Sequence, residues 1–114
     1  DVVACVRAAI IEQLPTGKCS RESVAAALSL SPETLQSRLA SRQTSFHALL
    51  GGIREECARA FLSQASLSVT EIAYMAGFTD VSNFTRAFKR WTGQSPSAFR
   101  QQLVGSRSGS PDKG

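Results

Sequence analysis

Three cations close together, Arg86, Lys89 and Arg90, are the residues whose type and spacing best suit a defined chemistry. A guanidinium can donate to guanine O6 and N7 at once, and both kinds of cation can contact phosphate oxygens. Six basic and six acidic residues balance in residues 1–57, whereas seven basic against three acidic residues in 58–114 carry the whole net charge of +4. A basic half indicates a polyanionic partner, usually nucleic acid, although many protein surfaces are mildly basic.

The sequence holds little material for catalysis or metal binding. Cys5, Cys19 and Cys57 stand at wide, unrelated spacings, and His47 is the only histidine. Zinc sites need paired ligands such as C-x-x-C, and a disulfide framework needs an even number of cysteines. No cysteine has a histidine or a basic neighbourhood at a catalytic spacing. We therefore expect buried or idle thiols, no metal, no cofactor and no enzymatic activity.

Nothing in the sequence predicts a membrane segment. No stretch reaches the roughly 18 to 20 apolar residues that span a bilayer. The first residues also lack the basic region and cleavage site of a signal peptide. We therefore expect no membrane partner and a cytoplasmic location. Because the sequence opens on Asp1 without a methionine, we expect a fragment of a longer protein.

The elements that must position the cations are helices throughout. Apolar residues recur at helical spacing, and neither alternating β-branched runs nor Asn-Gly or Asp-Gly turns occur. The run Ser31-Pro32-Glu33 combines a capping hydroxyl, a proline at the first helical position and a favourable negative charge. The prediction is an all-α fold of seven helices, over residues 2–14, 21–28, 32–40, 46–63, 69–76, 81–92 and 96–103, followed by a disordered tail over 104–114.

The longest predicted helix contains an unfavourable pair, Gly51-Gly52. Two glycines inside a helix cost on the order of 2 kcal/mol relative to two alanines. We expect a kink, a close packing contact or a late helix start at this pair. About 18 helical residues span about 27 Å, so this helix could separate two DNA-reading helices by about one 34 Å turn of the duplex.

Two segments of the sequence repeat one pattern. VAAALSLS from Val24 and IAYMAGFT from Ile72 each combine a short helix, a tight break and a hydroxyl residue, and apolar residues four apart follow each. The copies are offset by 48 residues before the break and 49 after it. A helix, a short turn and a second helix form the helix-turn-helix pattern, whose second helix enters the major groove. One copy is a weak signal, but two copies in register predict two DNA-reading lobes.

The stretch SVTEIAYMAGFTDVSNFTRAFKRWTGQSPSAFR, residues 68–100, closely resembles the signature of the AraC/XylS transcription regulators. The resemblance covers about residues 20–103. It implies a DNA-binding domain over 1–103, with a first helix-turn-helix lobe at about 1–42, a linker helix at about 45–63 and a second lobe at about 66–103. It further implies a bacterial regulator that associates with the nucleoid. Its implied partners are double-stranded DNA, RNA polymerase and an effector-binding or dimerisation domain before this fragment.

The second helix of the later copy has one face free for DNA. Phe84, Phe88 and Trp91 mark its buried stripe, so the polar residues of the opposite face are available. Arg86 is the best single candidate for base readout. Its alternative role is a surface ion pair with Asp80.

By the 49-residue offset, Ser82, Thr85 and Arg86 correspond to Glu33, Gln36 and Ser37 of the first copy. The family places base-reading residues at these helix positions. Gln36 can read adenine with two hydrogen bonds. Glu33 can accept from cytosine N4, or it can serve only as a favourable charge at the helix start. A first lobe with a carboxylate on its reading face is expected to bind DNA less strongly than the second. The predicted base-reading residues are Glu33, Gln36, Ser37, Ser82, Asn83, Thr85 and Arg86.

Further polar residues around these helices are candidates for phosphate contact. Side-chain cations supply most such contacts, and a capped helix start can direct amide groups at the backbone of DNA. The alternative for each is an ordinary solvated face. The predicted phosphate contacts are Arg38, Lys89, Arg90, Ser95 and Arg100.

Two rival functions remain open at this stage. A DNA-repair methyltransferase can carry a domain of this kind, but the cysteines do not support one. A helical protein-interaction module is the second rival, in which Leu49, Leu50 and Ile53 would form an exposed docking face.

Overall fold

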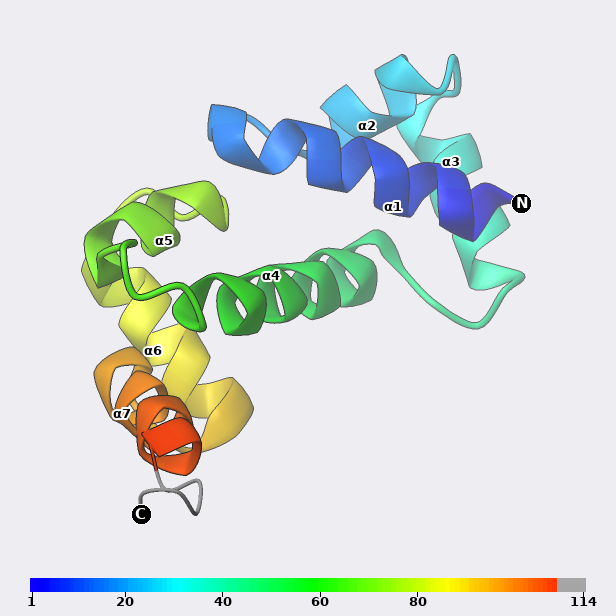
Figure 1. Ribbon diagram of the computed structural model, residues 1–114. Coiled ribbons are helices and arrows are strands. Elements are labelled where there is room, and N and C mark those ends of the chain that lie inside the picture. The colour runs from blue at the N-terminus through cyan, green and yellow to red at the C-terminus, as the bar shows by residue number, and fades with distance from the viewer. Residues whose placement is uncertain (109–114) are drawn as a thin grey trace.

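The chain folds into helices alone over the residues that the structure describes. The computed structural model describes residues 1–108 and contains no strand in that range (Figure 1). The all-α prediction is therefore confirmed. The elements are α1 (Val2–Gln13), the short 3₁₀ helix η1 (Leu14–Thr16), α2 (Arg21–Ala27), α3 (Pro32–Ala40), α4 (Phe46–Leu62), α5 (Val69–Met75), α6 (Val81–Thr92) and α7 (Pro96–Ser108).

Most helix starts are fixed by a hydroxyl or carboxylate cap. Ser31 accepts from the backbone N–H of Thr34, with Pro32 at the first helical position, as the sequence predicts. Ser68 and Glu71 form a capping box at the start of α5. The Ser68 hydroxyl accepts from the Glu71 N–H, and the Glu71 carboxylate accepts from the Ser68 N–H. Such caps satisfy the amide groups that have no partner inside the helix, each worth about 1 kcal/mol. Local sequence therefore sets where these helices begin.

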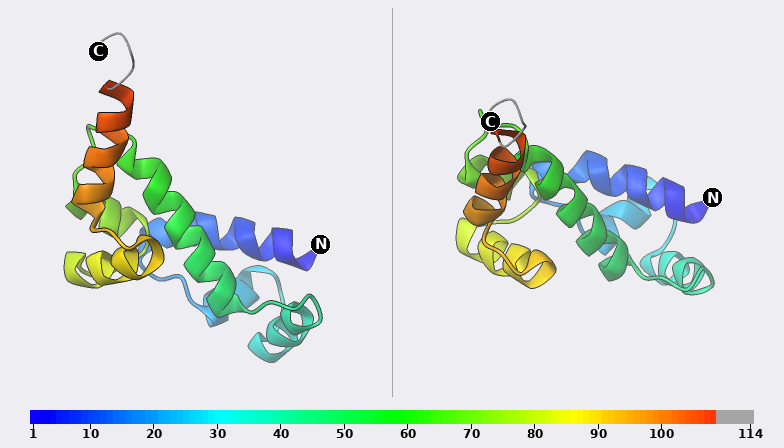
Figure 2. Two further views of the ribbon diagram at one scale, coloured as in Figure 1. Left: turned by 90° about the horizontal axis from the view of Figure 1, so that it is seen from below. Right: turned by 60° about the horizontal axis from the view of Figure 1, so that its bottom comes forward.

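Two hydrophobic cores divide the described residues into two lobes joined by α4 (Figures 1 and 2). The first core gathers α1, α2 and α3, and α4 adds Ile53 to it. The second core gathers α5, α6 and α7 around Phe84 and Phe88, and α4 adds Ala58 and Leu62. The linker helix α4 thus contributes buried side chains to both cores. The molecule is elongated, with extents of 54 × 26 × 21 Å.

The glycine pair in α4 matches neither the expected late helix start nor the expected close packing contact. The helix runs unbroken from Phe46 to Leu62, so neither a late start nor a break occurs at Gly51-Gly52. A Cβ added at either glycine would meet no atom within 4 Å, so no close packing requires them. Nothing in the structure explains this pair, and its helix-propensity cost stands without compensation by packing.

Two other expectations are corrected. The last helix continues to Ser108, five residues beyond the predicted end at Leu103, so the tail predicted over 104–114 starts too early. Residues 109–114 lie outside the described residues. The proposed docking face on α4 is also wrong, because Ile53 is 1% exposed and Leu49 and Leu50 pack against the first core.

Both predicted helix-turn-helix breaks use left-handed backbone. Gly77 has φ +90° and Ser29 has φ +61°, which a serine adopts less readily than a glycine. At Gly77 the two lobes also touch: a Cβ there would lie 2.7 Å from Leu14 Cδ2 at the end of the first lobe's long helix. The turn therefore needs glycine both for its backbone angle and for this close approach.

Candidate nucleic-acid interface

The second recognition helix, α6, separates a buried stripe from a polar face. Phe84 and Phe88 are fully buried, and ring-edge contacts join Phe88 to Trp91 and to Phe99. Ser82, Asn83, Arg86, Lys89 and Arg90 are exposed, and Thr85 is half-buried at the border. The helical period therefore places the predicted base-reading residues of this lobe on its surface.

A chain of hydrogen bonds orients Arg86. The Asp80 carboxylate caps α6 by accepting from the Asn83 N–H at 2.7 Å, and its other oxygen accepts from the Asn83 side-chain amide at 3.0 Å. The Asn83 side-chain oxygen in turn accepts from Arg86 Nη2. The alternative ion pair between Arg86 and Asp80 is not among the ion pairs of residues 1–108. Asn83 connects the two side chains instead.

The first recognition helix, α3, shows the same division of faces. Leu35 and Leu39 are buried, whereas Glu33, Gln36 and Ser37 are exposed. Glu33 also stands in the first turn of α3, where a negative charge is favourable, so its helix-start role and its base-reading role remain compatible.

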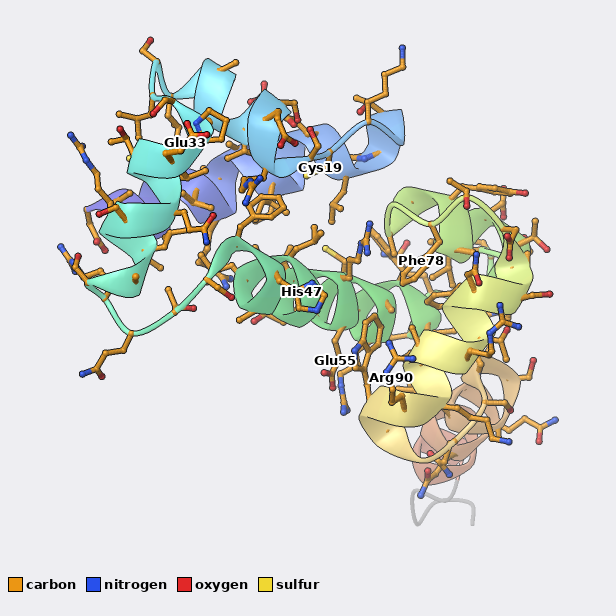
Figure 3. The ribbon with its side chains drawn as sticks, turned by 180° about the vertical axis from the view of Figure 1, so that it is seen from behind. Cys19, Glu33, His47, Glu55, Phe78 and Arg90 are labelled. Atoms are coloured by element: carbon orange, nitrogen blue, oxygen red, sulfur yellow. The ribbon has the colours of Figure 1, made fainter. Side chains whose placement is uncertain are left out.

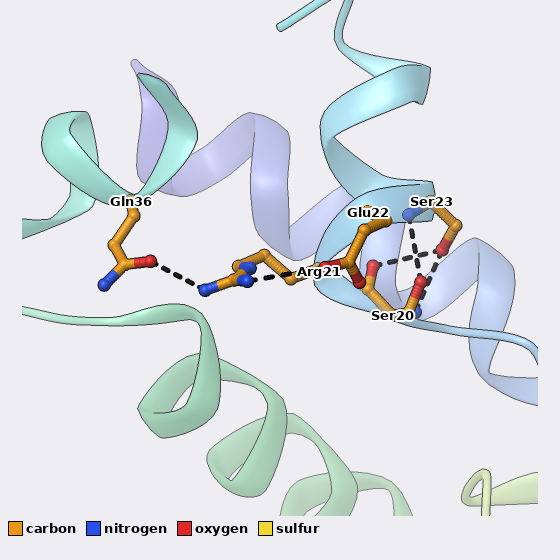
Figure 4. Close-up of polar contacts among 5 residues, drawn as sticks. All are labelled: Ser20, Arg21, Glu22, Ser23 and Gln36. Carbon is orange, nitrogen blue, oxygen red and sulfur yellow. Dashed lines mark hydrogen bonds and ion pairs between the residues drawn. The ribbon is translucent and has the colours of Figure 1, made fainter. Parts of the chain in front are cut away.

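Arg21 is a neighbour of the first reading face that sequence reasoning missed. Its Nη1 donates to Gln36 Oε1 at 2.7 Å, and its Nη2 pairs with Glu22 at 3.4 Å (Figure 4). The repeat gave no signal for Arg21, because the 48-residue offset puts it opposite Val69, an apolar residue. A carbonyl oxygen has two lone pairs, so Gln36 can accept from Arg21 and still present its amide to a base.

The predicted phosphate contacts fall into two groups. Lys89 and Arg90 are exposed on α6 and take part in none of the ion pairs of residues 1–108. Ser95 accepts from the Ala98 N–H at the start of α7, which leaves neighbouring amide groups at that helix start. Lys89 and Arg90 are thus exposed to solvent, whereas Ser95 is half-buried and caps α7.

Arg38 and Arg100 have other surroundings. Arg38 lies at a hollow formed with Asp1, Val2 and Cys5 of the first lobe, and the repeat offset sets it opposite the buried Ala87. Arg100 donates from Nε to the carbonyl oxygen of Leu62 and from Nη2 to that of Gln64, both at 3.1 Å. Arg100 thus serves the end of α4, whereas Arg38 is exposed and stays a predicted phosphate contact.

Arg54 joins the linker helix to the second lobe. Its guanidinium lies 4.7 Å from the centre of the Phe78 ring, and its Nη2 donates to the Gly77 carbonyl at 3.3 Å. Its buried Nε has no hydrogen-bond partner among the described residues. Burial lowers the pKa of this guanidinium, and the nearby Cys19 acts in the opposite direction.

The three cysteines lie apart from one another in different surroundings. All three are free thiols, with Cys5 exposed and Cys19 and Cys57 half-buried. Burial raises the pKa of Cys19, against the lowering effect of Arg54. Burial also raises the pKa of Cys57, assisted by the Glu56 carboxylate and opposed by Arg7. A raised pKa leaves less of the reactive thiolate at neutral pH.

Comparison with known proteins agrees with this geometry. A family model described as a helix-turn-helix domain matches residues 24–102. The HTH-type transcriptional regulator VirS of Mycobacterium tuberculosis is 38% identical over 87 residues, which cover 76% of this chain and 26% of VirS. The chain belongs to the AraC-type helix-turn-helix family. The matched family is a DNA-binding transcription regulator domain and not an enzyme domain.

Solved structures of AraC-type domains share the two-lobed fold. The DNA-binding domain of AdpA, a global transcriptional factor solved in complex with a target DNA, is 28% identical with a TM-score of 0.77 over 96% of this chain and 98% of that one. The C-terminal domain of AraT, a response regulator from Geobacillus stearothermophilus, is 32% identical with a TM-score of 0.79 over 89% of this chain and 84% of that one. DNA binding is therefore the function of this AraC-type domain.

The match is to part of longer relatives. The chain spans about a quarter of the length of VirS. Within residues 1–108, no group of three or more His, Cys, Asp or Glu side chains could hold a metal ion. None of the helices in the same range is long and apolar enough to cross a membrane.

Proposed function

We propose that this domain binds one asymmetric DNA site of roughly 20 base pairs, with α3 and α6 in successive major grooves. The observation that carries the proposal is the shared linker helix. Because α4 contributes Ile53 to the first core and Ala58 and Leu62 to the second, the two reading heads are parts of one packed unit. A single chain would then place two recognition helices in successive major grooves, which helix-turn-helix dimers achieve through their twofold symmetry.

The base-reading residues are proposed to be Glu33, Gln36 and Ser37 in the first lobe and Ser82, Asn83, Thr85 and Arg86 in the second. Arg86 would donate to guanine, since its guanidinium is exposed and already oriented by Asn83. Gln36 would read adenine while Arg21 holds its oxygen. Asn83 would act mainly through Arg86, because both ends of its amide are engaged.

The backbone of DNA is proposed to be held mainly by Lys89, Arg90 and the Ser95 end of α7. The second lobe therefore carries more of the sequence-independent affinity than the first, whose reading face includes Glu33. Each neutralised phosphate contributes about 0.9 to the slope of log affinity against log salt concentration, so binding should weaken steeply with salt.

The full-length protein is proposed to be a bacterial transcription regulator that acts at the nucleoid in the cytoplasm. It would carry an effector-binding or dimerisation domain before this fragment and would contact RNA polymerase. The support is that VirS, and a transcriptional activator of the Escherichia coli urease operon that is 36% identical over 93 residues, are both longer regulators.

Selection of binding sites from random DNA tests the proposal directly. We expect one asymmetric consensus with two blocks about one helical turn apart. Arg86→Ala should cost about 1–3 kcal/mol and remove the preference at one position of the second block, and Gln36→Ala should do the same in the first. A consensus with only one block, or base preferences unchanged in both variants, would contradict it.

A further inference from the structure

His47, the only histidine, lies between the two reading heads. It stands in the first turn of α4 and is exposed. Figure 3 shows it on the linker helix between Glu33 of α3 and Arg90 of α6. Two hollows share it: one of about 320 Å³ that also contains Arg21 and Gln36, and one of about 110 Å³ that reaches Arg90. A continuous side of the molecule thus runs from the first reading face through His47 to the second.

The smaller hollow, which we call the linker cleft, is basic. Its polar side chains are His47 and Arg54 of α4 and Arg90 of α6, and the rest of its lining is Leu50, Gly51, Phe78, Ala87 and Trp91. No acidic side chain lines the cleft among the described residues. The nearest acid in the neighbouring hollow, Glu22, is paired with Arg21. The cleft therefore attracts an anion and offers no counter-charge of its own.

Arg54 adds a further positive charge to the lining of the cleft. Its Nε atom is buried without a hydrogen-bond partner, whereas Nη2 is used on Gly77 and the ring of Phe78 covers one face of the guanidinium. The guanidinium as a whole is half-buried and Nε lies against Gly77, so Arg54 acts on an anion in the cleft through its charge and not through a donated hydrogen bond from Nε. A volume of about 110 Å³ is enough for several waters or for one phosphate group in their place.

We propose that the linker cleft binds one backbone phosphate of the DNA at the centre of the operator, between the two major grooves. His47 and Arg90 donate to its oxygens from opposite walls, and Arg54 supplies positive charge at the floor. This inference rests on the proposed function and adds the linker helix as a third point of contact. The contact is independent of base identity, because it reaches only the sugar-phosphate backbone.

The test is a double-mutant cycle on the selected DNA site, with His47→Gln, Arg90→Gln and both together. If one phosphate is shared, Arg90→Gln lowers affinity about tenfold, and adding His47→Gln costs less than it does in the wild type. Arg90→Gln should also reduce the salt slope by about 1, and the selected consensus should not change. Strict additivity, or a changed consensus, would overturn the shared phosphate.

A matched control removes a cation from the opposite side of α4. Arg7 pairs with Glu56 at 3.0 Å, and Glu56 lies about 200° around the helix from Arg54, since each residue turns the helix by about 100°. Arg7→Gln should change DNA affinity less than twofold. An equal loss in Arg7→Gln and Arg90→Gln would mean that net charge alone acts, and would overturn the cleft.

A separate arm distinguishes a DNA phosphate from a free anion. Without DNA, inorganic phosphate and chloride are compared at equal ionic strength. Any stabilisation by phosphate over chloride should be no larger in the wild type than in the double variant. Stabilisation by phosphate that disappears in the double variant, with DNA affinity unchanged, would show a free-anion site and overturn the proposal. If the wild type selects no DNA site, the proposed function itself fails; if it does and only the cycle fails, the inference alone is lost.

Discussion

At the scale of single residues, Asn83 decides how Arg86 meets DNA. Its amide accepts from Arg86 and donates to the Asp80 cap, so the guanidinium is oriented before any DNA arrives. Such preorganisation reduces the side-chain entropy lost on binding, about 0.5–1.5 kcal/mol for a long side chain. The cap that starts the helix and the residue that reads the base are therefore linked in one network.

We expect Asn83→Ala to weaken specific binding by about 1 kcal/mol and to relax the preference at the position that Arg86 reads. In a variant that already carries Arg86→Ala, the same change should cost much less, which binding titrations of the four proteins can measure. Thr34→Ala is a matched control, because Thr34 holds the corresponding place in α3 by the 49-residue offset. Equal losses with and without Arg86 would show that Asn83 contacts DNA by itself.

The cysteines give a second prediction at this scale. Burial raises the pKa of Cys19 and Cys57, so less thiolate is present at neutral pH, while Cys5 is exposed. Iodoacetamide at pH 7 should modify Cys5 first, as peptide mapping by mass spectrometry would show. In denaturant the three rates should become similar. Fast modification of Cys19 in the folded protein would contradict the burial described above.

At the scale of elements, two glycines should respond in opposite ways to alanine. Gly52→Ala should raise the free energy of unfolding by up to about 1 kcal/mol, since the helix continues there and the added Cβ meets nothing within 4 Å. Gly77→Ala should lower it by about 1–3 kcal/mol, because φ is +90° and the Cβ would clash with Leu14. Thermal or urea unfolding measures both. Destabilisation by Gly52→Ala would reveal a need for glycine that the packing does not show.

The elements also show what the sequence could predict. Helix starts at Ser31, Ser45 and Ser68 follow from local capping chemistry, and the two lobes follow from the repeat. The contact of Arg21 with Gln36 joins residues from two different helices, so it depends on how those helices pack. The unbroken linker helix overrides a local propensity, because the cores at both of its ends hold it in place.

At the scale of the whole molecule, the spacing between the two reading heads should be fixed. The lobes touch at Leu14 and Gly77, Arg54 holds the second lobe's turn, and α4 belongs to both cores. Inserting five base pairs between the two blocks of the site turns one of them by about half a helical turn. We expect such DNA to bind no more tightly than a site with one block. An insertion of ten base pairs restores the facing of the two blocks but should weaken binding as much, because the two reading heads cannot move apart. A competition assay with the original site measures both, and tolerance of either insertion would show that the lobes move independently.

The double membership of α4 also determines where this regulator could be recombined with a relative. A hybrid that takes its first reading head from another protein must keep Ile53 with the head it serves, and Ala58 with the other. Arg54 belongs with the second head, whose turn it holds. Beyond Arg54, however, Glu56 still pairs with Arg7 of the first head and Cys57 still packs against the first core. The contacts to the two heads therefore interleave along α4, and an exchange at either flanking loop would pair α4 with a core that it did not evolve with. A working hybrid should take α4 from the same parent as at least one complete head and repack the other.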